Sequence, residues 1–223
     1  MKLLVIGSEG FIGSHLLNHF HTRGDEVMGI DLKPSVYPRP YPTKQVLSVS
    51  YSLSAIVGSF IPDVCVFSGG SANVQLSIQQ PKSDFESNVQ AVSSLMDALL
   101  KINPSCKVLH ISSAAVYGNP ADLPVREDSP LQPLSPYGWH KQMAETLCSE
   151  YFICFGLPTC SVRLFSVYGE GQQKLLFWDL YRKIKSNEPP LLFGTGNESR
   201  DFLHISDLVS AFETIISKGV FNG

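Results

Sequence analysis

A glycine-rich stretch near the N-terminus constrains the fold of this chain more than any other feature. Residues 2–6 read Lys-Leu-Leu-Val-Ile, an apolar run without polar alternation that predicts a strand buried on both faces of a parallel sheet. Gly7, Gly10 and Gly13 follow at once, and residues 14–20 take up helical spacing. A strand, a glycine turn and a helix in this order direct backbone N–H groups and a helix N-terminus towards a phosphate. We therefore expect an anion-binding turn at the edge of an α/β sheet.

The next segment supplies an acid where a dinucleotide site needs one. Residues 26–31 predict a second strand, and it ends at Asp31, 18 residues after Gly13. An acid at this position accepts hydrogen bonds from the adenosine ribose of NAD and repels the 2′-phosphate of NADP. Glycines also serve ordinary turns, but the strand and the acid together favour a dinucleotide site. The sequence therefore predicts NAD as the cofactor.

Bulk properties exclude several classes of partner. The 223 residues are 43% hydrophobic, enough for one full α/β domain, or for one domain with a small lobe. A net charge of −3 and a pI of about 6.0 indicate neither a nucleic acid nor an anionic membrane as partner. No apolar run approaches the roughly 18 residues that span a bilayer, and no signal-peptide pattern is visible. The five cysteines form no C-x-x-C pair, so we expect reduced thiols in a cytoplasmic protein.

The remaining segments predict an alternation of strands and helices. Further strands are expected over residues 45–49, 63–67, 107–111 and 158–165, with an extended, proline-rich loop over 32–42. Helices are expected over residues 13–23, from Pro81 to before Pro104, from Pro136 onwards, and over 207–218 with Ser206 as its cap. His15 and His19 are spaced as zinc ligands on one helix face, but no acid or cysteine accompanies them, so we expect no metal.

A tyrosine and a lysine one helical turn apart carry the candidate chemistry. Ser135 and Pro136 start a helix in which Tyr137 and Lys141 project from one face. A phenol with a pKa near 10 is a poor base, but a nearby ammonium and the positive ring of oxidised NAD favour the phenolate and lower that pKa. A surface helix pair is the alternative reading. The pair follows a serine-bearing strand end, residues 107–113, at the edge where α/β sheets bind ligands, and this favours a catalytic pair.

The motifs together resemble those of the extended short-chain dehydrogenase/reductase superfamily, and most closely its nucleotide-sugar epimerase/dehydratase group. The resemblance rests on Gly-x-x-Gly-Phe-Ile-Gly over 7–13, Ser-Ser-Ala-Ala-Val-Tyr-Gly over 112–118 and Tyr-x-x-x-Lys over 137–141, and covers essentially the whole chain. It implies a Rossmann-type doubly wound parallel sheet with helices on both faces. It also implies an NAD-binding catalytic domain over residues 1–165. Residues 166–223 are expected to form a partial substrate lobe, interleaved with the last sheet elements, because relatives continue further.

The resemblance also assigns roles to individual residues. Tyr137 is expected to act as base and acid on a sugar hydroxyl, Lys141 to bind the nicotinamide ribose, and Ser113, rather than Ser112, to hydrogen-bond the reacting oxygen. The expected cofactor contacts are Gly7, Gly10, Phe11, Ile12, Gly13, Asp31, Ser68, Gly69, Gly70, Asn88, Ser112, Tyr137 and Lys141. The expected substrate contacts are Ser113, Tyr137, Ser166 and Arg200.

Several positions depart from the family pattern or keep a second reading. The aspartate that usually holds adenine is replaced within residues 48–51, so that contact is lost or made by a serine. Residues 67–70 keep the small residues of the family but drop its histidine, and Ser166 stands where asparagine is usual. Asn88 has an alternative role as a partly buried helix residue, and Arg200 as a partner of Asp201 or Glu198. His110 is expected to be a packed histidine with satisfied nitrogens.

The favoured function is NAD-dependent epimerisation of a nucleotide-activated sugar through a transient keto-sugar. A 4,6-dehydratase is disfavoured because Ala114 and Ala115 replace its acid–base pair. A sugar-nucleotide reductase and a non-catalytic nucleotide-binding scaffold remain as alternatives. We also expect a homodimer through the helices near 82–103 and 136–155, which carry the apolar residues Leu95, Met96, Leu147, Tyr151 and Phe152.

Overall fold

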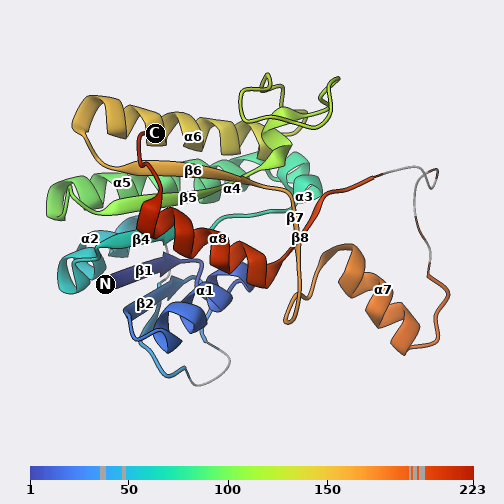
Figure 1. The fold of residues 1–223 in the computed structure, drawn as a ribbon, viewed down its shortest axis with the longest axis horizontal. Helices are drawn as coiled ribbons and strands as arrows, with labels where there is room; N and C mark the ends of the chain where they lie inside the picture. Colours follow the sequence, from blue (N-terminus) through green and yellow to red (C-terminus); the bar gives the residue numbers. More distant parts are fainter. Residues whose placement is uncertain (36–38, 47–48, 191, 193–194, 196–198) are drawn as a thin grey trace.

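The computed structural model describes residues 1–35, 39–46, 49–190, 192, 195 and 199–223, with the side chains of residues 49–52 also outside the description (Figure 1). The strands are β1 (Lys2–Ile6), β2 (Glu26–Asp31), β3 (Thr43–Gln45), β4 (Val64–Phe67), β5 (Lys107–Ser113), β6 (Thr159–Leu164), β7 (Ser166–Tyr168) and β8 (Phe202–His204). The α-helices are α1 (Phe11–Thr22), α2 (Val49–Phe60), α3 (Val74–Gln79), α4 (Pro81–Phe85), α5 (Ala91–Ile102), α6 (Pro136–Phe155), α7 (Leu175–Lys185) and α8 (Ile205–Lys218). A π-helical turn, η1 (Glu86–Gln90), joins α4 to α5, and a 3₁₀ turn, η2 (Ala114–Tyr117), follows β5.

Six strands form one parallel sheet in the order β3-β2-β1-β4-β5-β6. The central strands are buried on both faces, which explains their continuous apolar sequences. The strand order reverses between β1 and β4, so crossovers leave β1 and β4 in opposite directions. In open α/β sheets this reversal creates a crevice at the carboxyl ends of the strands, where ligands bind. The predicted doubly wound Rossmann-type fold is therefore confirmed.

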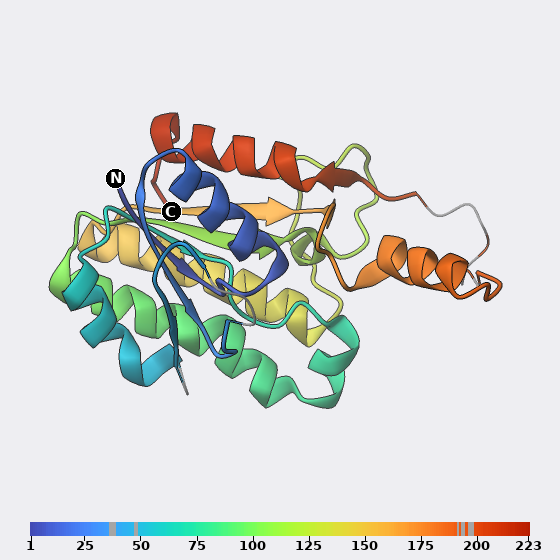
Figure 2. The same cartoon turned by 90° about the horizontal axis from the view of Figure 1, so that it is seen from below.

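Helices cover both faces of the sheet (Figure 2). On one face, α2, α5 and α6 pack over a core that includes Leu53, Leu95 and Cys148. On the other face, α1 and α8 pack side by side over a second core that includes Leu16, Phe20 and Phe212. Helix α8 is thus part of the sheet domain, although it comes from the end of the chain.

A smaller unit lies beyond the carboxyl edge of the sheet. Strands β7 and β8 pair in parallel, with Ser166 opposite Phe202, and α7 projects away from the main sheet (Figure 1). No residue of α7 is fully buried. The chain then returns to the sheet through α8.

The structure corrects several predicted elements. The third strand covers Thr43–Gln45 rather than 45–49, and α2 begins at Val49, where a strand was expected. Helices α3 and α7 were not predicted. Helix α8 begins at Ile205, and its cap is the His204 side chain rather than Ser206. Ser48, a candidate adenine contact, lies outside the described residues. None of the described helices combines the length and apolarity that crossing a membrane requires.

Candidate active site

The glycine turn forms a close-packed cradle between β1 and α1. Gly7 has a positive φ of 83°, and a Cβ there would lie 2.7 Å from the Gly69 nitrogen. A Cβ on Gly13 would overlap the Gly7 carbonyl oxygen, so the helix can approach the turn only without a side chain. Phe11 and Ile12 pack against the α1–α8 core and leave their backbone at the helix start.

The N-terminus of α1 remains open to an anion. Its N-cap residue, Gly10, makes no side-chain capping bond, and the first turn contains no acidic residue. The first N–H groups of a helix lack intrahelical partners and carry the positive end of the helix dipole. The sequence predicts that this cradle binds a pyrophosphate, and that stays a prediction.

Asp31 lies at the end of β2 beside this cradle. Its Oδ2 accepts a hydrogen bond from the Glu9 N–H at 2.9 Å, and its Oδ1 accepts one from the Lys33 N–H at 2.9 Å. These bonds fix the carboxylate, while each oxygen keeps a further acceptor position for a ribose hydroxyl. The geometry is consistent with the predicted role.

The segment after β4 faces the same crevice. The Ser68 hydroxyl donates to the Ile6 carbonyl oxygen at 2.9 Å and ties this segment to β1. Gly70 has a φ of 96°, and a Cβ there would overlap Oδ1 of Asn88. Asn88 is fully buried in the π-helical turn and donates to the Ser71 carbonyl oxygen at 3.1 Å. Its Oδ1 has no hydrogen-bond partner among the described residues, which leaves an acceptor beside the predicted cofactor segment.

Tyr137 and Lys141 are both buried on the first turns of α6. Ser135 caps this helix by accepting a hydrogen bond from the Gly138 N–H at 3.2 Å. The Tyr137 N–H donates to Oγ of Ser77 at 3.2 Å, which fixes the helix start against α3. The Lys141 Nζ donates to the Ile111 carbonyl oxygen at 2.9 Å and lies 6.0 Å from the centre of the Tyr137 ring. The predicted pair is therefore assembled at the end of β5.

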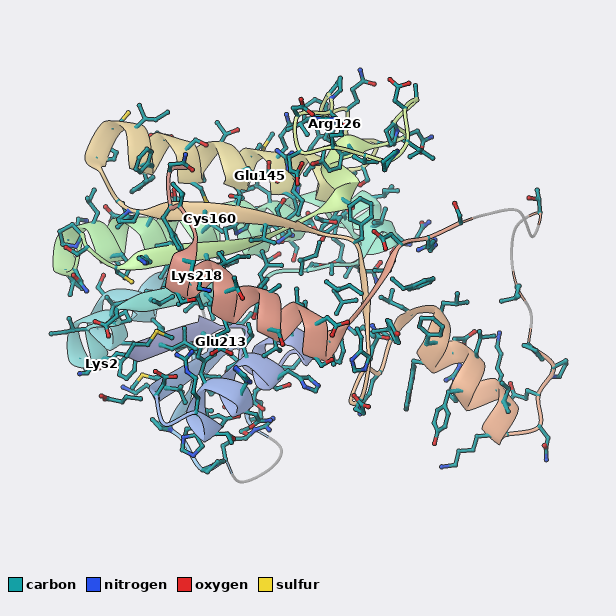
Figure 3. All side chains as sticks on the ribbon, in the orientation of Figure 1. Lys2, Arg126, Glu145, Cys160, Glu213 and Lys218 are labelled. Atoms are coloured by element: carbon teal, nitrogen blue, oxygen red, sulfur yellow. The ribbon has the colours of Figure 1, made fainter. Side chains whose placement is uncertain are left out.

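The two candidate serines have different surroundings. The Ser113 hydroxyl lies near Tyr137 and acts to lower the pKa of its phenol, and the Ser113 Oγ accepts a hydrogen bond from the Ala115 N–H at 3.2 Å. The Ser112 hydroxyl instead donates to Glu145 of α6, with an oxygen–oxygen distance of 2.5 Å. Glu145, labelled on α6 in Figure 3, in turn accepts a hydrogen bond from Nη2 of Arg163 of β6 at 2.8 Å. The geometry therefore favours Ser113 as the partner of Tyr137, and it commits the Ser112 side chain to a structural network.

Burial determines the pKa values of the tyrosine and the lysine. It raises the pKa of Tyr137, an effect that the Ser113 hydrogen bond opposes and the negative charge of Asp84 increases. Burial lowers the pKa of Lys141 to about 8, although nearby acids, Asp84 foremost, act in the opposite direction. The sequence predicted a lowered pKa for Tyr137. That prediction includes the positive ring of oxidised NAD and stays a prediction for the complex; in the protein alone, removal of the phenolate from water raises the pKa.

A buried aspartate–histidine contact beside this site was not predicted. The Asp84 Oδ2 of α4 lies 2.6 Å from Nδ1 of His140, and both side chains are largely buried. Asp84 precedes Asn88 by four residues, so one face of the α4–η1 segment contributes two polar groups to the crevice. Only the fold brings Asp84 to α6, and no local sequence signal indicates this contact.

The two predicted substrate residues of the lobe are Ser166 and Arg200, and the backbone brings Ser166 next to the neighbour of Arg200. Ser166 is the first residue of β7, and its N–H donates to the Asp201 carbonyl oxygen at 3.2 Å. Arg200 directly precedes Asp201 and is exposed. Its proposed ion-pair partner Glu198 lies outside the described residues.

His110 differs from its prediction. It is fully buried on β5 and its ring lies against Phe67, with ring centres 6.0 Å apart. Neither ring nitrogen has a hydrogen-bond partner among the described residues, so the histidine is packed but not satisfied. Burial and the Lys141 charge hold its pKa well below the usual range, which keeps the ring neutral.

Known proteins resemble this chain over nearly its whole length. A putative UDP-glucose 4-epimerase of Methanocaldococcus jannaschii is 30% identical over 94% of this chain and 71% of its own length. An uncharacterized UDP-glucose epimerase of Bacillus subtilis, YtcB, is 32% identical over 98% of this chain and 73% of its own length.

Among solved structures, the UDP-glucuronic acid 4-epimerase of Bacillus cereus, in complex with UDP-glucuronic acid and NAD, superposes with a TM-score of 0.89. It is 28% identical, and the match covers 99% of this chain and 74% of that one. The sequence model of the NAD dependent epimerase/dehydratase family matches residues 3–222. The chain, with its glycine cradle, its acid Asp31 and its Tyr137–Lys141 pair, thus belongs to the NAD dependent epimerase/dehydratase family.

Proposed function

We propose that this protein epimerises a nucleotide-activated sugar, with NAD as the cofactor. The observation that carries the proposal is the group formed by Ser113, Tyr137 and Lys141 at the carboxyl edge of the sheet, next to the open glycine cradle. Relatives named as UDP-glucose and UDP-glucuronic acid 4-epimerases support a uridine diphosphate sugar as the substrate.

In the proposed reaction, Tyr137 accepts the proton of a sugar hydroxyl while Ser113 hydrogen-bonds the same oxygen. NAD, when bound, supplies reversible hydride acceptance and a positive ring beside the phenol. The buried Lys141 ammonium stabilises the phenolate and holds a ribose hydroxyl. After the keto-sugar turns in the site, Tyr137 returns the proton to the oxygen, and the carbon has inverted.

The features next to Ser113 favour epimerisation over water elimination. Ala114 and Ala115 begin the 3₁₀ turn that follows β5, and their methyl groups cannot transfer protons. Elimination of water from a sugar requires an acid and a base near the reacting carbons. A dehydratase is therefore the less supported alternative.

We further propose that residues 1–165 hold NAD and the catalytic group, and that the lobe within residues 166–223 holds the sugar nucleotide. The proposed homodimer rests on exposed apolar side chains along α6, namely Trp139, Met143, Ile153 and Phe155. Leu95 and Met96, two of the residues that suggested a dimer in the sequence, are fully buried in the core of this subunit. Both lie on the inner face of α5, so the dimer proposed through the helices near 82–103 and 136–155 does not rest on them.

The test is incubation with NAD and a panel of UDP-, dTDP- and GDP-sugars, followed by product analysis by NMR. Tyr137→Phe keeps the ring but removes the proton acceptor, so turnover is expected to fall by about 10²–10⁴-fold. Tyr151→Phe is the matched control, because Tyr151 lies on the same helix outside the site. A chain that binds NAD but interconverts none of the sugars contradicts the proposal and favours a nucleotide-binding scaffold.

A further inference from the structure

The anion cradle contains an acidic residue, Glu9, whose presence is not explained by phosphate binding. Glu9 lies between Gly7 and Gly10, one residue before the N-cap of α1. A carboxylate there opposes the positive helix end that would bind a phosphate. Yet only 9% of the Glu9 side chain is exposed, so the fold keeps this charge inside rather than releasing it to solvent.

The Glu9 charge is held by an arginine from the loop after β2. The Arg39 Nη2 lies 3.1 Å from the Glu9 Oε2, and only 20% of the Arg39 side chain is exposed. Tyr41 is buried beside the pair and donates its hydroxyl proton to Asn18 of α1 at 2.8 Å. The ion pair is therefore shielded from water and is screened less by salt than a surface pair.

The pair lies against the acid that is expected to bind the adenosine ribose. The Glu9 N–H donates to Oδ2 of Asp31 at 2.9 Å, so Glu9 and Asp31 are in direct contact. This corner holds two carboxylates and one guanidinium, a net charge of −1. The Arg39 Nε is buried and has no hydrogen-bond partner among the described residues, so this donor is unsatisfied and also out of reach of a ligand in this arrangement.

We propose that Glu9 is a second specificity residue for the cofactor, which acts by holding Arg39 away from a 2′-phosphate. Guanidinium groups bind phosphate strongly, and an arginine near the ribose is a common means of binding NADP. In this protein the ion pair occupies the guanidinium, and Glu9 adds its own charge to that of Asp31. The chain thus contains an NADP-binding group that is kept unavailable by its neighbour. This inference rests on the proposed function only through the NAD site.

The experiment measures dissociation constants of NADH and NADPH by fluorescence titration, without any sugar substrate. Glu9→Gln neutralises the corner and frees Arg39, so NADPH is expected to bind about 10–100-fold more tightly, the range of one charge-assisted hydrogen bond. Relief of the Glu9 repulsion on the pyrophosphate acts on NADH and NADPH alike and cancels in the ratio of their dissociation constants, whereas only NADPH has a 2′-phosphate to gain from the guanidinium. Arg39→Gln leaves Glu9 uncompensated and is expected to widen the preference for NADH.

Two further proteins make the test specific. The double variant Glu9→Gln/Arg39→Gln is expected to lose the NADPH gain, because the freed guanidinium is then absent. Glu26→Gln is the matched control, since Glu26 begins the same strand as Asp31 but is 61% exposed at the opposite end. It removes the same charge and is expected to leave the ratio of the two dissociation constants unchanged.

The preference for NADH is expected to narrow in Glu9→Gln and to widen in Arg39→Gln. These opposite shifts separate the proposal from general destabilisation, which would weaken the binding of both nucleotides alike. An unchanged ratio in Glu9→Gln, or a gain that persists in the double variant, overturns the proposal. If the Glu9 variant does not fold, Arg39→Gln alone still decides, because an unchanged or narrowed preference for NADH contradicts it. Failure of sugar turnover with intact NADH binding refutes the epimerase proposal but not this one.

Discussion

Replacement of Lys141 by methionine is expected to stabilise the fold while it destroys the site. Lys141 is only 4% exposed, and among the described residues the hydrogen-bond partner of its ammonium is the Ile111 carbonyl oxygen at 2.9 Å. Methionine matches the length of the lysine stem and buries no charge. The change therefore removes a desolvated cation from a well-packed helix interface.

The size of the gain follows from the pKa of Lys141. Burial lowers this pKa from 10.5 to about 8. One pKa unit is worth about 1.36 kcal/mol, so the buried ammonium costs the folded state about 3 kcal/mol at neutral pH. Loss of the hydrogen bond to Ile111 offsets about 1 kcal/mol. We therefore expect Lys141→Met to gain about 2 kcal/mol, which raises Tm by roughly 4–8 °C for a chain of this size.

The pH dependence gives the sign of the effect. Below pH 8 lysine is charged in both the folded and the unfolded chain, so the full cost is present and the gain is constant. Between about pH 8 and 10.5 the unfolded chain binds more protons than the folded one, so wild-type stability rises with pH and the gain shrinks. Above 10.5 lysine is neutral in both states and the gain from removing its charge disappears.

Urea denaturation at pH 7, 8.5 and 9.5 measures these differences directly. Lys82→Met serves as the control, because Lys82 is 91% exposed and its replacement is expected to change stability by less than about 0.5 kcal/mol. A Lys141→Met protein that is less stable than the wild type at pH 7, or a gain that does not fall towards pH 9.5, would refute this reasoning. The same variant should bind NAD much more weakly, since the ribose contact is lost.

Further measurements test the other assignments. Asp31→Ala should narrow the difference between the NADH and NADPH dissociation constants, and equal affinities in the wild type would contradict the assignment of Asp31 as the ribose acid. Ser113→Ala should lower turnover and leave NAD affinity unchanged in a calorimetric titration, so a large loss of NAD binding would argue against its role at the substrate oxygen. Gly13→Ala should cost about 1–3 kcal/mol in urea denaturation, because its Cβ would overlap the Gly7 carbonyl oxygen. Light scattering at micromolar protein should give about twice the subunit mass of 24.5 kDa, whereas a monomer mass would refute the homodimer.

The sequence predicts those parts of the fold that depend on local pattern. Buried parallel strands such as β1 and β5 are continuous apolar runs, and glycines mark the turn that only small residues allow. Helix α2 was missed because its first residues, Val-Ser-Tyr-Ser, have the composition of a strand, and tertiary packing overrides that preference. Helix α3 has only six residues, too few for a helical period to be recognised.

In the site, too, local sequence patterns could be predicted and long-range contacts could not. The cradle and the Tyr–Lys pair are motifs within a few residues of one another, so spacing alone identifies them. The contacts of Asp84 with His140, of Glu145 with Arg163 and of Glu9 with Arg39 join residues 56, 18 and 30 positions apart. Such pairs depend on how helices and strands pack, and a single sequence contains no signal for them.

The position of α8 has a consequence for how the chain folds during synthesis. Glu213, labelled on α8 in Figure 3, binds Arg23 at 2.9 Å. Arg23 follows the end of α1 and lies 190 residues away in sequence, and Phe212 of α8 completes the core over α1. A chain emerging from the ribosome therefore makes β1 and α1 well before α8, the helix that packs over their core. Until α8 emerges, the apolar face of β1 and α1 stays open to water and to other chains. We expect nascent chains shorter than about 205 residues to depend on chaperones or to aggregate through this face.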